Sequence, residues 1–286
     1  MEELQAGTVV SLMVDRDAPF GYFLTNGEED VLLHKKDLTD EFNEDDRNTV
    51  FLYQDHQGRL AATMTIPTVQ IGVYDWVEVV EIRHDLGVFI NIGISKDILV
   101  SKDDLPGVDH IWPQKGDVLY CSLKTDKNGR LFGKLATEDV IRTISKPASK
   151  KDFNKNVTGH VYRLLLVGSF MVTEEGYIGF IHESERRQEP RLGEKVEGRI
   201  IDVKDDGSVN ISLLARTHEI LDDDAKQLYS YMESRGGAMP YWDKSDPDDI
   251  MERFQMSKGA FKRALGRLMK DGKVYQEEGW TYFKNE

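Results

Sequence analysis

Short segments in which apolar and polar residues alternate fill most of the first 215 positions, and a clear example lies near the N-terminus. Phe20–Leu24 and Asp30–His34, separated by a polar turn, predict two β-strands joined in a hairpin. Side chains alternate between the two faces of a strand, so Phe20, Tyr22 and Phe23 cannot all point into one core. At least one aromatic ring is therefore expected on the outer face of this hairpin.

The same strand pair occurs twice more in the chain. The second copy is Leu86–Ile90 followed by Ile98–Ser101, and the third is Val167–Met171 followed by Gly179–His182. In every copy an aromatic residue stands two positions after a glycine, and a histidine or serine follows 11 or 12 positions later. Repeats at so regular a spacing indicate one structural unit that is used three times.

Each repeat predicts five short strands with a long connection between the third and the fourth. The first module covers residues 1–66, the second 67–144 and the third 145–217. Five strands in this order are typical of the OB-fold, a five-stranded Greek-key barrel. The basic, proline-containing stretch 145–151 begins the third module, and we interpret it as a solvated tether.

Helical periodicity replaces alternation in residues 218–286. It predicts a helix over Asp222–Ser234, a second helix that begins near Pro247, and a third from the capping residue Ser257 to about Asp271. A short hairpin over 274–283 follows. This order resembles a winged helix. The predicted fold class is therefore multidomain and mainly β, with three OB-fold five-stranded barrels followed by a C-terminal α+β winged-helix domain.

The formal net charge of −14 argues against unselective binding to nucleic acid, because phosphate contacts need Lys and Arg. The charge is uneven, however: residues 1–62 sum to −9, 63–144 to −3, 145–217 to +1 and 218–286 to −3. Local basic faces are thus possible in the later modules. The chain has one cysteine and no apolar run that approaches a membrane span, so we expect a cytoplasmic protein with no membrane partner.

The third module carries the most complete motif: Gly-x-Phe in its second strand, then Gly179-Phe180-Ile181-His182, Gly193-Glu194-Lys195-Val196 and Ile211-Ser212-Leu213. This pattern resembles the S1-type RNA-binding domain of ribosomal protein S1. The resemblance implies three S1-like barrels whose second- and third-strand aromatics, with the following histidine, contact RNA. By motif position these residues are Phe20, Phe23 and His34 in the first module, Phe89 in the second, and Phe170 and His182 in the third.

The second and third modules depart from this pattern. Leu86 and Ser101 replace the first aromatic and the histidine in the second module, and Val167 replaces the first aromatic in the third. Aromatic side chains on an exposed sheet offer flat surfaces on which unpaired bases stack. The departures therefore predict that the three modules bind RNA unequally.

Two groups of basic residues are candidate phosphate contacts. One group follows the third strand of the third module, and the other lies on the outer face of the third helix of the winged helix. Five acidic residues of the winged helix, at 248, 249, 252, 277 and 278, would repel phosphate, and a solvated helix face explains the second group equally well. The candidates are Arg186, Arg187 and Arg191 in the first group, and Lys258, Lys262, Arg263 and Arg267 in the second.

Three S1-type modules before a winged helix resemble the conserved virulence factor B proteins of Gram-positive bacteria. This resemblance implies a single-stranded RNA-binding, post-transcriptional regulator of virulence gene expression. Two alternatives stay open: a DNA-binding transcription factor that uses the winged helix, or a protein-interaction scaffold. Motifs for phosphate-loop, serine-hydrolase and zinc-protease sites do not occur, and the seven histidines are scattered. We therefore expect no enzyme activity, no metal and no cofactor.

Overall fold

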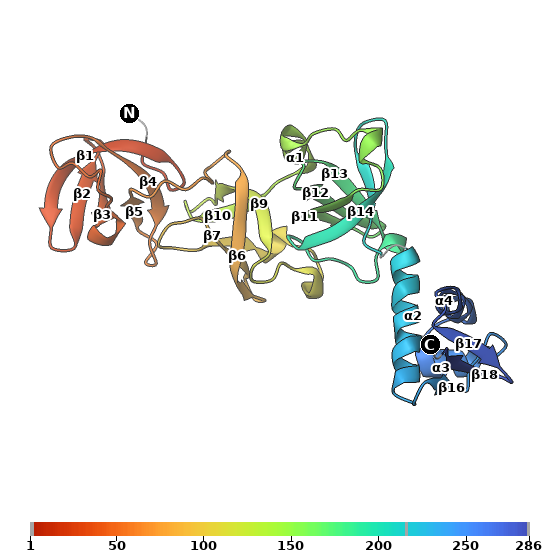
Figure 1. Ribbon diagram of the computed structural model, residues 1–286. Helices are drawn as coiled ribbons and strands as arrows, with labels where there is room; N and C mark the ends of the chain where they lie inside the picture. The colour runs from red at the N-terminus through yellow and green to blue at the C-terminus, as the bar shows by residue number, and fades with distance from the viewer. Residues whose placement is uncertain (1–2, 215–216, 285–286) are drawn as a thin grey trace. The chain divides into compact units, whose positions relative to one another are not determined.

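The computed structural model describes residues 3–214 and 217–284. It divides into a unit that ends at Leu213 and a unit that begins at Leu214, and each is described by itself. Within the described ranges, the first unit holds three closed five-stranded barrels, and the second combines helices with a three-stranded sheet (Figure 1). The predicted fold class is thus confirmed. No helix in these ranges is both long and apolar enough to cross a membrane.

The first barrel forms because inward-facing apolar residues alternate with polar ones along its strands. Leu24, Leu33, Val50 and Leu52 are fully buried and meet at its centre. The strands close in the order β1-β2-β3-β5-β4, with β4 also paired to β1. The strands are β1 (Val9–Ala18), β2 (Gly21–Thr25), β3 (Asp30–His34), β4 (Asn48–Gln54) and β5 (Leu60–Thr63).

The second barrel repeats this topology, with β9 and β10 closing it. Leu119, Cys121 and Leu123 alternate into its core from one strand. Burial raises the pKa of the Cys121 thiol to about 12, so this cysteine is an inert core residue. The strands are β6 (Asp75–Arg83), β7 (Gly87–Asn91), β8 (Ile98–Ser101), β9 (Val118–Thr125) and β10 (Leu131–Leu135).

The third barrel closes in the order β11-β12-β13-β15-β14. Its core is built around the fully buried Met171, Ile181, Ile200 and Ile211. The strands are β11 (Asn156–Leu165), β12 (Gly168–Thr173), β13 (Ile178–His182), β14 (Lys195–Val203) and β15 (Val209–Ser212).

A short helix that the sequence pattern did not predict, α1 (Glu138–Ile144), covers part of the third barrel. Ile141 on this helix is fully buried against Val172 of β12 and Ile178 of β13. Residues that the sequence placed in the second module therefore pack on the outer face of the third barrel, and Phe170 of β12 packs against the same cluster.

The stretch 145–151 also packs on the third barrel. The Lys146 N–H donates to the Gly176 carbonyl at 2.8 Å, and the Ala148 N–H donates to the Gly207 carbonyl at 2.9 Å. Ala148 further contacts the apolar core of this barrel. The prediction of a solvated tether was wrong, because the backbone donors of the stretch find acceptors in two turns of the barrel.

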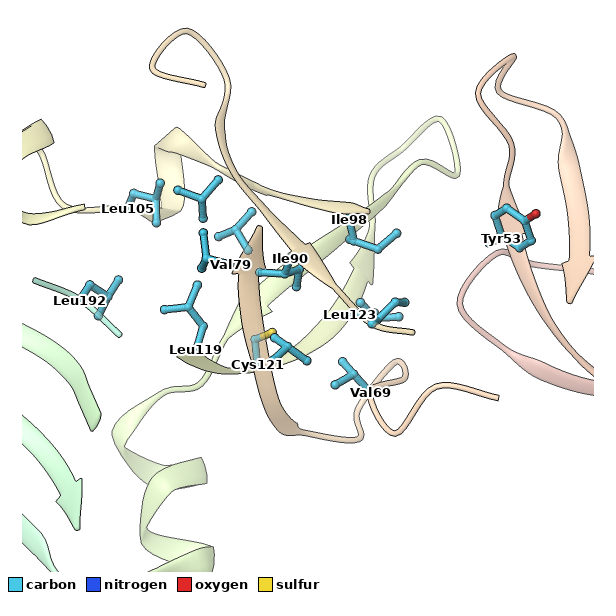
Figure 2. Packing of buried hydrophobic residues seen from close by; sticks show 14 of the residues in the cluster. Tyr53, Val69, Val79, Ile90, Ile98, Leu105, Leu119, Cys121, Leu123 and Leu192 are labelled. Carbon is cyan, nitrogen blue, oxygen red and sulfur yellow. The ribbon is translucent and has the colours of Figure 1, made fainter. Parts of the chain in front are cut away.

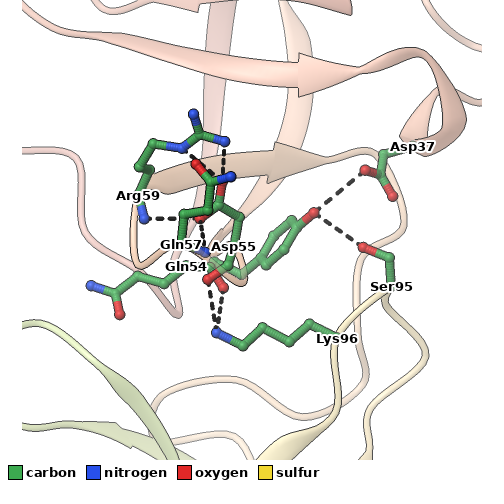
Figure 3. Close-up of polar contacts among 8 residues, drawn as sticks. Asp37, Gln54, Asp55, Gln57, Arg59, Ser95 and Lys96 are labelled. Atoms are coloured by element: carbon green, nitrogen blue, oxygen red, sulfur yellow. Dashed lines mark hydrogen bonds and ion pairs between the residues drawn. The ribbon is translucent and has the colours of Figure 1, made fainter. Parts of the chain in front are cut away.

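Apolar contacts join the three barrels. One cluster of buried residues includes Phe51, Tyr53 and Ala61 of the first barrel. It fills the second barrel and reaches Leu192 before β14 of the third (Figure 2). Polar contacts add to it at the first junction (Figure 3). There the Tyr53 hydroxyl is 3.1 Å from that of Ser95, and the Lys96 ammonium donates to the carbonyls of Gln54 and Asp55 at 2.7 and 3.1 Å. The barrels are therefore packed together through their junctions.

The C-terminal unit matches the winged-helix prediction. Its core gathers the buried Leu228, Met232, Phe254, Phe261 and Leu265 from three helices. The short strand β16 was not predicted, and it completes the sheet in the order β16-β18-β17. The elements are α2 (Thr217–Glu233), β16 (Ala238–Met239), α3 (Pro247–Phe254), α4 (Lys258–Lys270), β17 (Val274–Glu277) and β18 (Trp280–Phe283).

Candidate nucleic-acid interface

The repeated glycine brings two strands into close approach beneath each candidate aromatic. A Cβ atom added at Gly168 would lie 2.4 Å from the carbonyl oxygen of Ile181 in β13. At Gly21 and Gly87 it would lie 2.2 and 2.1 Å from the equivalent oxygens in β3 and β8. Only glycine fits at such a distance. The Gly-x-aromatic motif therefore fixes how each ring is presented on the barrel surface.

Strand register places each aromatic in a row of four residues that crosses the outer face of its barrel. The row begins on the first strand of the barrel and passes through the second and third strands to the fifth. The three rows are Arg16–Phe23–Leu32–Ala61, Glu81–Phe89–Leu99–Phe132 and Arg163–Phe170–Phe180–Asn210.

The third barrel has the fullest aromatic surface, and we call Phe170, Phe180 and His182 the third-barrel platform. The ring centroids of Phe170 and Phe180 are 5.0 Å apart, and those of Phe180 and His182 are 6.3 Å apart. Both phenylalanines are half-buried and His182 is exposed. The imidazole Nδ1 of His182 accepts the Ser184 N–H at 3.2 Å, which orients its ring. The rings thus form a stepped surface that runs from the half-buried Phe170, packed beside α1, to the exposed His182.

Tyr162 supports this platform from β11. Its ring centroid lies 6.2 Å from that of Phe170, and burial raises its pKa to about 12. Tyr162 is therefore a packing residue beside Phe170.

The first barrel presents its rings differently. Phe20 is 49% exposed, but the ring of Phe23 is covered by the Arg16 guanidinium, whose carbon lies 4.1 Å from the ring centroid. Asp30 holds Arg16 with a 2.7 Å ion pair. His34 is half-buried, and its Nδ1 accepts the Lys36 N–H at 3.3 Å. Strand register therefore places Phe23 and His34 on one outer face, with a cation already on the Phe23 ring, while Phe20 is exposed just before β2.

The second barrel differs from the third around its candidate aromatic. Phe89 is half-buried and faces Leu99 instead of a second aromatic. Ser101, in the position of the histidine, uses its hydroxyl to cap a short helix at Asp103. On the first strand, the acidic Glu81 lies opposite Phe89. This placement agrees with the unequal binding that the sequence predicts.

Two of the three predicted arginines of the third barrel have structural contacts. The Arg186 side chain is 8% exposed, donates to the Ser169 hydroxyl and pairs with Glu189 at 3.0 Å. Arg191 crosses to the second barrel and pairs with the buried carboxylate of Asp117 at 3.0 Å. These contacts argue against phosphate binding by Arg186 and Arg191, because their guanidinium groups are occupied within the protein. Arg187 is exposed and stays a candidate.

The basic candidates of the winged helix lie on α4. Lys262 and Arg263 are exposed, Lys258 is half-buried, and Arg267 pairs with Asp271 at 3.1 Å. Exposed ion pairs between residues one helical turn apart contribute little to stability, so Arg267 can leave Asp271 and bind a phosphate instead. The helix therefore provides a modest basic face.

Sequence reasoning missed a second group of aromatics, on the outer face of the β16-β18-β17 sheet. Tyr275 and Trp280 are 41% and 43% exposed. The ring centroid of Tyr282 lies 5.4 Å from that of Tyr275 and 6.3 Å from that of Trp280, with nearly parallel planes. The alternation of Trp280 and Tyr282 around the buried Thr281 was the signal that could have found them.

Phe180, Arg163 and Lys204 were also missed in the third barrel. Phe180 stands two residues before His182 in one strand, so alternation alone places both on the same face. Each cation lies over a ring: the Arg163 guanidinium carbon is 5.8 Å from the Phe170 centroid, and the Lys204 ammonium is 5.8 Å from the Phe180 centroid. The platform therefore has positive charge close to two of its rings, from β11 and from the turn that follows β14.

Comparison with domain families follows the same division of the chain. Residues 6–65 match the S1 domain, and residues 74–134 match the family described as the CvfB first S1-like domain. Residues 141–215 match the second domain of virulence regulatory factor CvfB, and residues 226–283 match the CvfB-like winged helix domain.

Whole-chain comparisons give the same result. "Uncharacterized protein YitL" of Bacillus subtilis (strain 168) is 53% identical over 283 residues, which cover 99% of this chain and 95% of that protein. "Conserved virulence factor B" of Staphylococcus epidermidis strain RP62A is 40% identical over 255 residues, which cover 88% and 85%. A crystal structure from Streptococcus pneumoniae, titled as a multidomain protein with nucleic acid binding domains, has a TM-score of 0.68 and 38% identity, with 98% of each chain covered.

The S1 domains and this structural neighbour point to nucleic-acid binding. The relative named conserved virulence factor B is 40% identical over 88% of this chain, and CvfB domain families match residues 74–134, 141–215 and 226–283. The chain therefore belongs to the conserved virulence factor B family.

Proposed function

We propose that this protein binds single-stranded RNA and acts as a post-transcriptional regulator, by binding and not by catalysis. The third-barrel platform is the observation that carries the proposal. Its stepped rings fit unpaired bases, which stack on aromatic side chains, whereas the bases of a duplex are already stacked on one another. The S1 family of the barrels and the name of the relatives support RNA as the ligand and virulence genes as the regulated set.

The charge distribution supports selective over general binding. A chain with a net charge of −14 cannot hold phosphate over its whole surface, so affinity has to come from local sites. In the third barrel, Arg163 and Lys204 lie beside the rings, and Arg187 is exposed nearby in sequence. The third barrel therefore combines stacking surfaces with cations, and we assign it the largest share of the affinity.

The test is a titration of the intact protein with a fluorescent single-stranded RNA and with a DNA duplex of the same length, at several salt concentrations. We expect tighter binding to the RNA. Phe180→Ala should weaken it by about 5- to 150-fold, as expected for the loss of one stacked base. Phe153→Ala is the matched control, because Phe153 is an exposed phenylalanine of the same barrel that lies outside the row of the platform. Equal or tighter binding to duplex DNA, or an unchanged affinity of Phe180→Ala, would reject the proposal.

A further inference from the structure

We infer that the first-strand residue beside each platform aromatic, namely Arg16, Glu81 or Arg163, decides whether its barrel binds RNA. This inference rests on the proposed function and deepens it, because it identifies a contact to the RNA phosphate that the aromatic motif does not contain. An arginine at this position permits binding, and the glutamate of the second barrel prevents it.

The position is defined by the same backbone irregularity in all three barrels. In β11 the register shifts between Val161, which faces the core opposite Met171, and Arg163, which lies opposite Phe170. Equivalent shifts precede Arg16 in β1 and Glu81 in β6. A β-bulge inserts one residue and re-aims the next side chain. The bulge therefore turns this residue onto the outer face, next to the aromatic ring.

In the third barrel, Arg163 lies beside Phe170 of the platform. Its guanidinium carbon lies 5.8 Å from the centroid of Phe170, and one of its nitrogens pairs with Glu138 of α1 at 2.6 Å. Glu138 is also paired with Arg142 at 2.7 Å. These groups are partly exposed, and exposed ion pairs contribute little. A phosphate of a nucleotide stacked on Phe170 can therefore take over Arg163 while Glu138 keeps Arg142.

The first and second barrels differ from the third at this point. Arg16 is paired with two carboxylates, Asp15 at 2.5 Å and Asp30 at 2.7 Å, in the most acidic part of the chain. Its charge is more fully compensated, so the first barrel should bind more weakly than the third. In the second barrel, Glu81 places a negative charge where the phosphate would lie, and like charges repel.

The first experiment removes the arginine of the third barrel. Arg163→Ala in the intact protein should weaken binding to single-stranded RNA by about fivefold or more at moderate salt. The slope of log affinity against log salt should also become shallower by about 0.7, the value for one phosphate contact on a single strand. Lys195→Ala is the matched control. It removes one positive charge from an exposed ion pair of the same barrel, with Glu174, and should change neither quantity.

The second experiment adds an arginine to the second barrel. Glu81→Arg should strengthen binding about fivefold to an RNA long enough to reach two barrels, and it should steepen the salt slope. Glu78→Arg makes the same charge change on the same strand, but Glu78 lies opposite Asn91 instead of the aromatic. An equal gain from both variants would show a general charge effect and would overturn the inference.

The proposed function and the inference about the arginine have different outcomes that would contradict them. If Phe180→Ala weakens binding while Arg163→Ala behaves like Lys195→Ala, the platform binds RNA and the inference about the arginine is wrong. If neither Phe180→Ala nor Arg163→Ala changes binding, the proposed function is wrong as well. Arg163→Gln, which removes the positive charge but keeps a polar side chain with N–H donors, repeats the measurement if the alanine variant loses its fold.

Discussion

Replacement of Phe170 separates stacking on RNA from packing within the third barrel. The sequence allowed either a surface ring or a core ring, and the structure places it between the two. The ring is half-buried, with centroids of Phe180 and Tyr162 at 5.0 and 6.2 Å. Truncation of a fully buried phenylalanine to alanine costs about 3–5 kcal/mol. We therefore expect Phe170→Ala to destabilise the third barrel by about 1–3 kcal/mol, and to lose a further ~1–3 kcal/mol of RNA binding.

Phe170→Leu distinguishes the two contributions. Leucine keeps most of the apolar contact with Tyr162 but has no flat π-face for a base. Stability should fall by only about 1 kcal/mol, because the replacement keeps hydrophobic volume. Binding should fall about as far as in Phe170→Ala, since stacking is lost in both variants.

Hydrogen exchange of the β12 and β13 amides is the suitable stability assay, with anisotropy titrations for RNA affinity. A global melting curve would not report the third barrel by itself, because the three barrels share an apolar cluster and their unfolding transitions are coupled. Exchange reports the local opening free energy of the strands that carry the platform. If Phe170→Leu binds RNA as tightly as the unmodified protein, the ring serves packing only, and the stacking argument is refuted.

Three further changes test the framework around the platform. Gly168→Ala should destabilise the third barrel by about 3 kcal/mol, measured by urea unfolding, because its Cβ would overlap the Ile181 carbonyl. Hydrogen bonds from Lys155 and the Ser149 backbone lower the pKa of Asp152 to about 2, below its usual value of about 3.9. The stability that the ionised Asp152 confers is therefore complete above about pH 4 and is lost toward pH 2. Asp152→Asn should lower the melting temperature at pH 7 but not at pH 2. Asp117→Asn should cost about 1–3 kcal/mol and speed limited proteolysis between the second and third barrels, since it leaves Arg191 without its buried partner.

Local sequence patterns were enough to locate the repeated units and most of their strands. Alternation of apolar and polar residues is set by the two faces of a strand, so it can be read locally and it located the strand pairs of all three barrels. The glycine two positions before each aromatic was found as a repeated motif. The reason for it, the close approach of the neighbouring strand, appeared only in the structure. The helices of the C-terminal unit followed from helical periodicity, with α2 beginning five residues earlier than predicted.

The residues that surround each aromatic could be identified only in the folded chain. The bulges in β1, β6 and β11 reverse the alternation just before Arg16, Glu81 and Arg163, so counting along the strand would have placed these residues on the wrong face. The role of Arg191 likewise depends on Asp117, which lies 74 positions earlier in the chain. Periodicity reports the face of one strand, whereas register, bulges and contacts between barrels depend on the pairing of distant segments, and that pairing is fixed only when the chain folds.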